Sequence, residues 1–174
     1  MPDEPSFDWI EPGLALGGCV DQHSPQALAG FGVGAVIDLR DEACDDPAAL
    51  EACGLRFLHL PTPDLQSIPP NMLQAGLDFA EEARVRGRAL LVHCQHGIGR
   101  SALLALCIMV DRGWTPSAAI ARLKQARVQV SPSPSQYRAW ASWLQEWKDR
   151  HHAAWTIPDF DAFAAIAYRR LAEI

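Results

Sequence analysis

The sequence predicts an α/β fold in which a small, largely parallel central sheet is flanked by helices, with an extra helix at the C-terminus. Two observations support this prediction. Apolar runs of strand length alternate along the chain with segments of helical pattern, which is the order of elements that builds a helix-covered parallel sheet. The chain also has 174 residues, 49% of them apolar, which is enough for one full core.

The first 60 residues alternate short strands with short helices. Pro12-Gly13 is a turn signal between two short strands, which we expect at the edge of the sheet. Ser24 and Pro25 are typical of a helix start, and Gly54 is typical of a helix end. The expected elements are edge strands within 9–18, a helix over 24–30, a strand over 34–40, a helix over 46–53 and a strand over 55–60.

The remaining elements are longer. Four prolines within 61–70 predict a loop. An amphipathic helix follows over 71–86, with most apolar contacts expected from Met72, Ala75, Leu77, Phe79 and Ala83. We then expect a strand over 89–93, a helix from about Arg100 to Gly113, and helices over 115–127 and 133–150. The last of these carries a stripe that we expect in the core, formed by Trp140, Trp143, Leu144 and Trp147.

Residues 151–174 are predicted to be a helical extension of a domain that spans 1–150. Thr156-Ile157-Pro158 is typical of a helix start, and an apolar stripe follows at Phe160, Phe163, Ala167, Leu171 and Ile174. Such a stripe is more often buried against its own chain than used for binding, so we expect a monomer. The alternatives are a segment that packs on a second copy, giving a dimer through 151–174, or one that covers the active site.

Composition excludes several classes of protein. The apolar stretches are too short to span a membrane and the N-terminus is acidic and proline-rich, so we expect a cytoplasmic protein. The net charge of −6 counts against nucleic acid or an anionic membrane as the main partner. Five cysteines at irregular spacing predict neither a zinc site nor a disulfide scaffold. Cys44 or Cys53 could resolve an oxidised Cys94, although unpaired thiols are the favoured interpretation. We expect no metal and no cofactor.

The segment 92–101 carries the strongest functional signal. Cys94 is followed by a short glycine-containing loop, then by Arg100 and an apolar helix. Such a loop turns backbone N–H groups inward, and the helix adds the positive end of its dipole. The guanidinium of Arg100 can hold two phosphate oxygens, and this positive field favours a thiolate at Cys94. The loop is therefore expected to bind a phosphate and attack it. The predicted phosphate-binding residues are Gln95, His96, Gly97, Ile98, Gly99 and Arg100.

The residues from His93-Cys94 to Arg100-Ser101 match the pattern HCxxGxxRS. In this the chain resembles the Cys-based protein tyrosine phosphatases, in particular the dual-specificity branch and the small bacterial and archaeal enzymes close to it. The resemblance covers roughly residues 7–148. It implies a small, largely parallel sheet flanked by helices and metal-independent hydrolysis of phosphate monoesters through a cysteinyl phosphate. It also implies that His93 orients the loop and that Ser101 helps the thiolate leave.

The resemblance further implies a carboxylic acid that protonates the leaving oxygen. Asp64 is the best candidate, because it lies 30 residues before Cys94 in the proline-rich loop after a predicted strand. The alternative is an aspartate that only caps a turn. Gln136 matches a residue that contacts the site in related enzymes, but its role as part of a helix start capped by Ser133 explains it equally well.

An acidic run follows the strand over 34–40. We interpret Asp41-Glu42 and Asp45-Asp46 as a solvated rim that tunes substrate choice. Asp38 is expected to face outward at the strand end or to cap a neighbour.

Two departures from the family pattern bear on the substrate. His96 replaces a small residue, and the loop has no Lys to meet the several phosphates of an inositol polyphosphate. The predicted substrate is phosphotyrosine, with phosphoserine and phosphothreonine, in proteins. The alternatives are a non-protein phosphate (phosphoinositide, nucleotide or sugar), a phospho-binding pseudophosphatase, and the sulfur or arsenate chemistry of rhodanese-like and arsenate-reducing proteins.

Overall fold

A computed structural model describes residues 4–170 of the chain. Within this range the strands form one sheet in the order β1-β2-β5-β3-β4. Strands β2, β5, β3 and β4 are parallel, and β1 pairs antiparallel with β2. The bounds are β1 (Phe7–Glu11), β2 (Leu14–Gly17), β3 (Ala35–Arg40), β4 (Arg56–Thr62) and β5 (Leu90–His93). The predicted fold class is confirmed.

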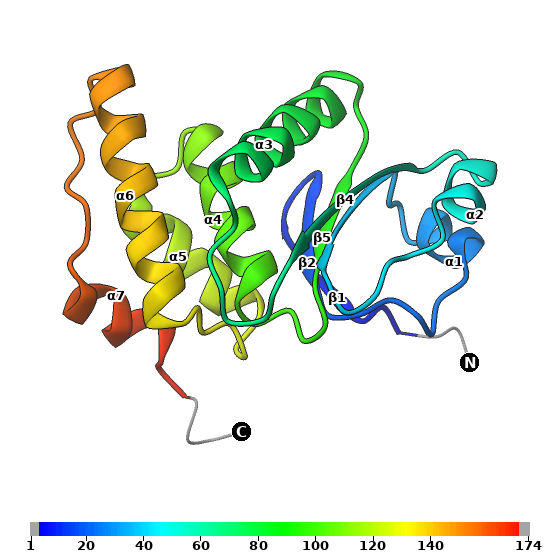
Figure 1. Cartoon of the computed structure of the whole chain (residues 1–174), viewed down its shortest axis with the longest axis horizontal. Coiled ribbons are helices and arrows are strands. Elements are labelled where there is room, and N and C mark those ends of the chain that lie inside the picture. Colours follow the sequence, from blue (N-terminus) through cyan, green and yellow to red (C-terminus); the bar gives the residue numbers. More distant parts are fainter. Residues whose placement is uncertain (1–3, 171–174) are drawn as a thin grey trace.

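Helices cover both faces of the sheet. Helices α1 and α2 lie on one face, and α3 to α7 lie on the other (Figure 1). Side chains that accept a hydrogen bond from the first turn, among them Ser24 and Asp46, fix several helix starts. The bounds are α1 (Pro25–Gly30), α2 (Pro47–Ala52), α3 (Pro70–Val85), α4 (Arg100–Asp111), α5 (Pro116–Ala126), α6 (Pro134–His151) and α7 (Phe160–Ala167).

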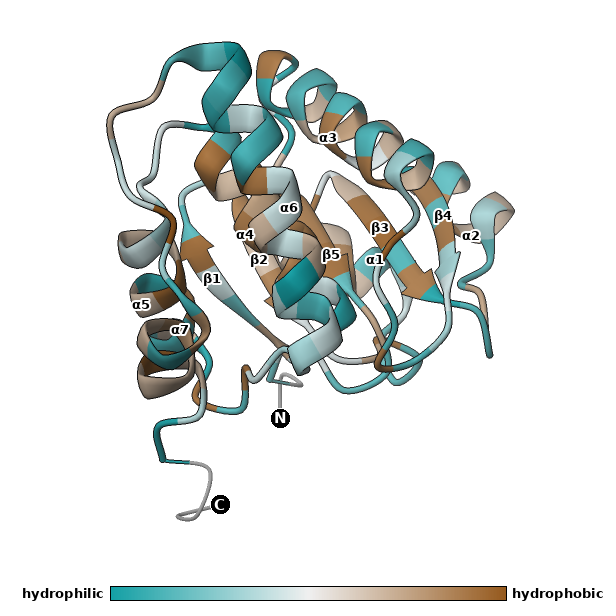
Figure 2. Cartoon of the chain, turned by 60° about the vertical axis from the view of Figure 1, so that its left-hand side comes forward, coloured by the Kyte–Doolittle hydropathy of each residue, from teal (hydrophilic) through white to brown (hydrophobic). Residues whose placement is uncertain are grey.

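The core centres on α4. Every residue of this helix from Arg100 to Val110 is buried, and the helix contacts α3, α5, α6, β2 and β5. In Figure 2 its mostly apolar ribbon lies behind α6, and the strands beside it are apolar as well. Strands β2, β3 and β5 are buried along their whole length, because helices cover the sheet on both faces.

Two expectations for the strands were wrong. Only β1 of the first pair is an edge strand, because β2 pairs on its other side with β5. Strand β4 also continues through Pro61 to Thr62, two residues into the predicted loop. Proline has no N–H to donate, but β4 is an edge strand and tolerates it.

Two expectations for the helices also need correction. In α3 the buried face is formed by Leu73, Gly76, Leu77, Ala80 and Ala83, whereas Met72, Ala75 and Phe79 are only partly buried. The last helix begins at Phe160 rather than at 156–158, because the side chain of Asp159 accepts the Ala162 N–H and caps it.

Helix α7 packs on its own chain. Phe163 and Ala167 are fully buried in the same core as α4, and α7 contacts α5 and α6. The Tyr168 hydroxyl donates to the Pro132 carbonyl at 2.7 Å, and the Tyr137 hydroxyl donates to the Pro158 carbonyl at 2.8 Å. Phe160 remains partly exposed, and Leu171 and Ile174 lie outside the described residues. The division of the chain at residue 150 stays a prediction.

Candidate active site

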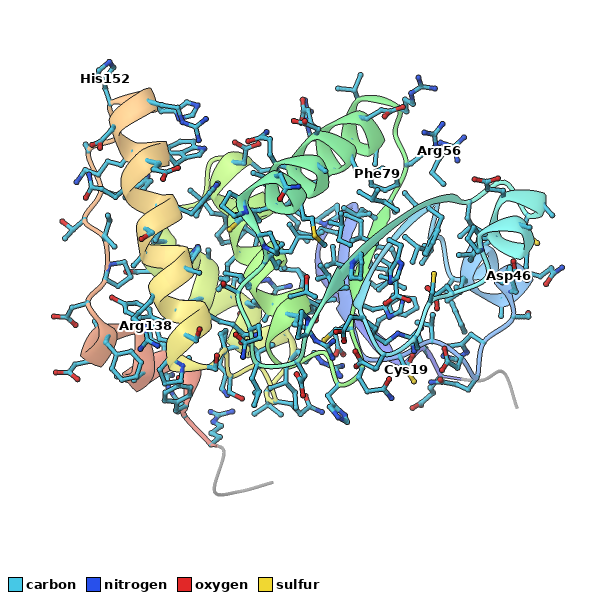
Figure 3. The ribbon with its side chains drawn as sticks, viewed as in Figure 1. Cys19, Asp46, Arg56, Phe79, Arg138 and His152 are labelled. Carbon is cyan, nitrogen blue, oxygen red and sulfur yellow. The ribbon has the colours of Figure 1, made fainter. Side chains whose placement is uncertain are left out.

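The loops that follow the parallel strands meet at one edge of the sheet. The loop 94–99 joins β5 to α4 there, beside the loops 41–46 and 63–69 that follow β3 and β4. Cys19, in the segment after β2, marks this edge in Figure 3, and its N–H donates to the Gln95 carbonyl at 2.9 Å. The carboxyl ends of parallel strands are where open α/β sheets bind ligands, so this edge is the candidate active site.

Cys94 lies at the start of the loop with its side chain almost fully buried. Its Sγ is 3.3 Å from the Ser101 hydroxyl and accepts the Gly97 N–H at 3.3 Å. Burial alone would raise the pKa of the Cys94 thiol, but these hydrogen bonds and the charge of Arg100 lower it below its usual value. These contacts therefore stabilise the thiolate relative to the thiol at this position.

Two glycines allow the loop to close tightly. Gly97 has φ +67°, and a Cβ there would lie 2.5 Å from the carbonyl carbon of Gly17. At Gly99 a Cβ would lie 2.6 Å from the side-chain oxygen of Gln136. A side chain at position 97 would clash with the backbone of β2, so Gly97 is a structural requirement of the site, whereas a side chain at position 99 would force the Gln136 side chain to move.

The hydrogen bonds of Arg100 leave one edge of its guanidinium open. Nη1 and Nη2 each donate to the Glu42 carboxylate at 2.7 Å, and Nη1 also donates to the Thr62 carbonyl at 2.9 Å. The buried Nε–H has no hydrogen-bond partner among the described residues, and the Asp64 carboxylate lies 3.6 Å from Nε as an ion pair. The donors left over are therefore Nε–H and one N–H of Nη2, which lie side by side and match two oxygens of a phosphate.

Glu42 is one of two site residues, with Asp45, that the sequence does not identify. It was predicted to be part of a solvated rim, yet its carboxylate holds Arg100 in a bidentate pair. The hydrogen bonds from Arg100 lower the pKa of Glu42 to about 2. The only signal in the sequence is its place just after the strand predicted over 34–40; that this strand neighbours β5 is known from the structure alone.

Asp64 lies at the same edge, in the loop after β4. Its Oδ1 is 3.6 Å from Arg100 Nε and accepts the N–H of Leu65 at 2.9 Å. The carboxyl is largely exposed, which leaves room for a substrate beside it. Leu65 has φ +63° and is 62% exposed, so an apolar side chain stands on the rim next to Asp64.

His93 is buried directly before Cys94. Its Nε2 lies 2.6 Å from Asp45 Oδ2 and its Nδ1 lies 3.3 Å from the Cys94 carbonyl. Burial would lower the pKa of His93, but its hydrogen bond and charge interaction with Asp45 raise it above the usual value. Since both ring nitrogens face acceptors, the geometry fits a doubly protonated ring. Asp45 was therefore wrongly assigned to a solvated rim.

Asp38 is fully buried rather than facing outward. It accepts the backbone N–H groups of Arg40 and Asp45, which agrees with the expected capping role, and it pairs with the Arg40 guanidinium. Burial would raise the pKa of Asp38, but the hydrogen bonds from Arg40 lower it. Oxygens of Asp38 and Asp45 and a nitrogen of His93 lie close enough to hold a metal ion. Arg40, however, donates to both carboxylates at 2.9 Å and already supplies positive charge there.

The other predicted site residues lie in the loop itself and in the first turn of α6. His96 is exposed at the loop, and Gln95 is half-buried with its carbonyl held by Cys19. Gln136 is buried against Gly99, and its amide bonds the Ser133 N–H and the Gln66 carbonyl. It thereby completes the capping box of α6 and ties that helix to the loop of Asp64.

Comparisons with known proteins agree with this geometry. Residues 14–149 match the family model "Dual specificity phosphatase, catalytic domain". Similar relatives include mouse dual specificity protein phosphatase 12, 35% identical over 105 residues (58% of this chain and 30% of the relative). Mouse phosphatidylglycerophosphatase and protein-tyrosine phosphatase 1 is 30% identical over 95 residues (53% and 49%). The Arabidopsis thaliana phosphatidylglycerophosphate phosphatase PTPMT2 is 28% identical over 134 residues (75% and 59%). The chain thus spans less than two thirds of the length of these relatives.

Solved structures show the same fold. The structure of PTPMT1 in complex with PI(5)P has a TM-score of 0.76 at 22% identity, covering 84% of this chain and 99% of that one. Tk-PTP in its active form has a TM-score of 0.72 at 25% identity, covering 84% and 98%. Among the described residues, no helix has both the length and the apolar character needed to cross a bilayer. The family match covers most of the chain and includes the loop 94–99, so the chain belongs to the dual specificity phosphatase family.

Proposed function

We propose that this protein hydrolyses phosphate monoesters through a cysteinyl phosphate on Cys94. The observation that carries the proposal is the open Nε/Nη2 edge of Arg100 beside a thiol whose pKa is lowered. The guanidinium and the backbone N–H groups of the loop, of which that of Gly97 points at Cys94 Sγ, match the charge of a phosphoryl group in transfer.

The reaction proceeds in two steps. The Cys94 thiolate attacks phosphorus, so that an S–P bond forms while the P–O bond to the leaving group breaks. Asp64 gives its proton to the leaving oxygen in this step. Water then attacks the cysteinyl phosphate and gives a proton to the Asp64 carboxylate. The S–P bond breaks, and the thiolate is received by the Ser101 hydroxyl, 3.3 Å from the sulfur.

The proposed substrates are phosphotyrosine, phosphoserine and phosphothreonine in proteins. The mouse relative named dual specificity protein phosphatase 12 supports this substrate class. The absence of lysine from the loop 94–99 supports a substrate with a single phosphate, because each further phosphate would need its own positive partner.

A second candidate is a phospholipid with a terminal phosphate monoester. Two of the relatives are named as phosphatases of phosphatidylglycerophosphate. The exposed side chain of Leu65 also stands beside Asp64, where the organic part of a substrate leaves. An apolar rim at this point favours a lipid or an aromatic ring over a sugar.

A substrate panel tests the proposal and separates the two classes. Phosphopeptides, phosphatidylglycerophosphate in mixed micelles, inositol phosphates and nucleotides would each be assayed for phosphate release with and without EDTA. We expect turnover to persist in EDTA, since Arg100 and the loop supply the positive charge. The class with the highest kcat/KM identifies the substrate. Turnover of none of them would refute the hydrolase and favour a phospho-binding protein, and thiosulfate sulfurtransferase activity alone would favour the rhodanese-like alternative.

The intermediate can be tested directly. Acid quenching during turnover of a ³²P-labelled substrate is expected to trap label on the wild-type chain and none on Cys94→Ser. The serine variant is expected to keep its affinity for vanadate, because Arg100 and the loop N–H groups are unchanged. Full activity in Cys94→Ser would exclude the cysteinyl phosphate.

A further inference from the structure

The shape of the loop 94–99 depends on what holds its carbonyl oxygens. A nest that presents N–H groups to an anion must turn carbonyls outward, and those oxygens need donors of their own. The Gln95 and Ile98 carbonyls accept from the backbone N–H groups of Cys19 and Ser131, at 2.9 and 3.0 Å. The His96 and Gly97 carbonyls accept from one side chain, that of Arg127, whose Nη2 and Nε lie at 2.9 and 3.0 Å.

One of these carbonyls belongs to the peptide that also touches the nucleophile. The N–H and C=O of a trans peptide point in opposite directions. The peptide joining His96 to Gly97 therefore gives its oxygen to Arg127 and its N–H to Cys94 Sγ, at 3.3 Å. A cation on the oxygen both fixes the plane of this peptide and polarises its N–H toward the sulfur.

Arg127 is itself held in place. It lies at the C-terminal end of α5 with only 12% of its side chain exposed, and its Nη1 donates to Asp8 Oδ2 at 2.9 Å. Asp8 lies on β1, before residue 14, where the family match begins. The guanidinium thus joins the first strand to the candidate active site through three directed hydrogen bonds.

We propose that Arg127 is a positioning residue that orients the 96–97 and 97–98 peptides and, through them, stabilises the Cys94 thiolate. The inference rests on the proposed function of the loop. The side chain acts through the backbone and does not itself contact the phosphoryl group. Asp8 restricts the guanidinium to the orientation in which Nε and Nη2 reach the loop.

The test compares Arg127→Met with Arg122→Met. Arg122 lies on the same helix and bonds the same strand, with Nε 2.7 Å from the Ile10 carbonyl, but it has no bond to the loop. Both variants remove one arginine from the contact between α5 and β1. Only the first removes the donors to the loop, so Arg122→Met is the matched control.

The main readout is the pH dependence of Cys94 alkylation by iodoacetamide in the substrate-free protein. We expect Arg127→Met to move this titration to higher pH and to lower kcat/KM for p-nitrophenyl phosphate by about 10- to 100-fold. Arg122→Met is expected to leave the titration where it is. The other charged groups around the loop (Arg40, Arg100, His93, His96, Glu42, Asp38, Asp45 and Asp64) are the same in both variants, and Asp8 loses its arginine partner only in Arg127→Met. An unchanged titration in folded Arg127→Met would overturn the proposal.

A conservative pair covers the case in which Arg127→Met does not fold. In Arg127→Lys a single ammonium cannot hold both carbonyls and Asp8. We therefore expect a smaller shift of the Cys94 titration in the same direction and a higher inhibition constant for vanadate. Arg122→Lys is expected to match the wild type, and identical titrations for the two lysine variants would also refute the role. A wild-type protein without phosphatase activity whose thiol titration still depends on Arg127 would overturn the proposed function and leave this inference standing.

Discussion

Replacing Glu42 by Gln tests how Arg100 is prepared for its ligand. The amide keeps the shape of the side chain but offers one acceptor where the carboxylate offers two, at 2.7 Å each. Its NH₂ group would face a donor of Arg100. The Nη1/Nη2 edge would lose its bidentate partner, and the guanidinium could turn its Nε/Nη2 edge away from the anion.

The expected size of the Glu42→Gln effect follows from the ion pair between Glu42 and Arg100. The pKa of Glu42 falls from 4.5 to about 2, which would correspond to about 3 kcal/mol in a fully buried pair. The Glu42 side chain is 41% exposed, however, so solvent screening reduces the contribution to stability to about 1 kcal/mol. The loss of one hydrogen bond to a charged donor predicts a fall in kcat/KM of about 10- to 100-fold.

The assay is kcat/KM for p-nitrophenyl phosphate together with the inhibition constant of vanadate. Both are expected to worsen in Glu42→Gln. Because the pKa of Glu42 is lowered, the stabilisation from its ion pair with Arg100 is complete above the unfolded-state pKa of Glu42 and is lost only as the pH falls through about 2. The difference between variant and wild type should therefore be constant from pH 5 to 8. Tighter vanadate binding in the variant would mean that Glu42 competes with the anion, and would refute this reasoning.

Three further predictions concern Asp64, Asp45 and α7. Asp64→Asn should lower kcat by about 10²- to 10⁴-fold for alkyl phosphates, with a smaller loss for p-nitrophenyl phosphate, whose leaving group needs no proton; equal losses for both would exclude Asp64 as the acid. Asp45→Asn should lower the pKa of His93. Because the pKa of His93 is raised in the folded state, the stabilisation that protonated His93 contributes is complete below the unfolded-state pKa of 6.5 and is lost as the pH rises through the folded-state pKa. The fall in Tm caused by Asp45→Asn should therefore be larger at pH 5.5 than at pH 9. Phe163→Ala should destabilise the chain by about 3–5 kcal/mol in urea unfolding, because Phe163 is fully buried, and a loss below 1 kcal/mol would show that α7 is not part of the core.

The parts of the site that are close in sequence could be predicted from the residues alone. Cys94, the loop and Arg100 form one continuous strand–loop–helix segment, so their arrangement follows from local backbone preferences. Glu42 and Asp45 could not be placed in this way, because they reach Arg100 and His93 across the ends of neighbouring strands. A run of acidic residues reads as a solvated surface until the strand order is known. The same limit applies to β2, whose inner position depends on its pairing with β5.

The complete burial of α4 divides the protein into parts that can and cannot adjust during turnover. Its first residue, Arg100, is continuous with a helix that has no solvent-facing side from Arg100 to Val110. Any displacement of that helix would open gaps throughout the interior, so induced fit must be confined to the surface segments that carry Glu42 and Asp64. Amide exchange along α4 should accordingly be as slow as global unfolding allows and insensitive to vanadate, whereas the two surface segments should gain protection when the anion binds.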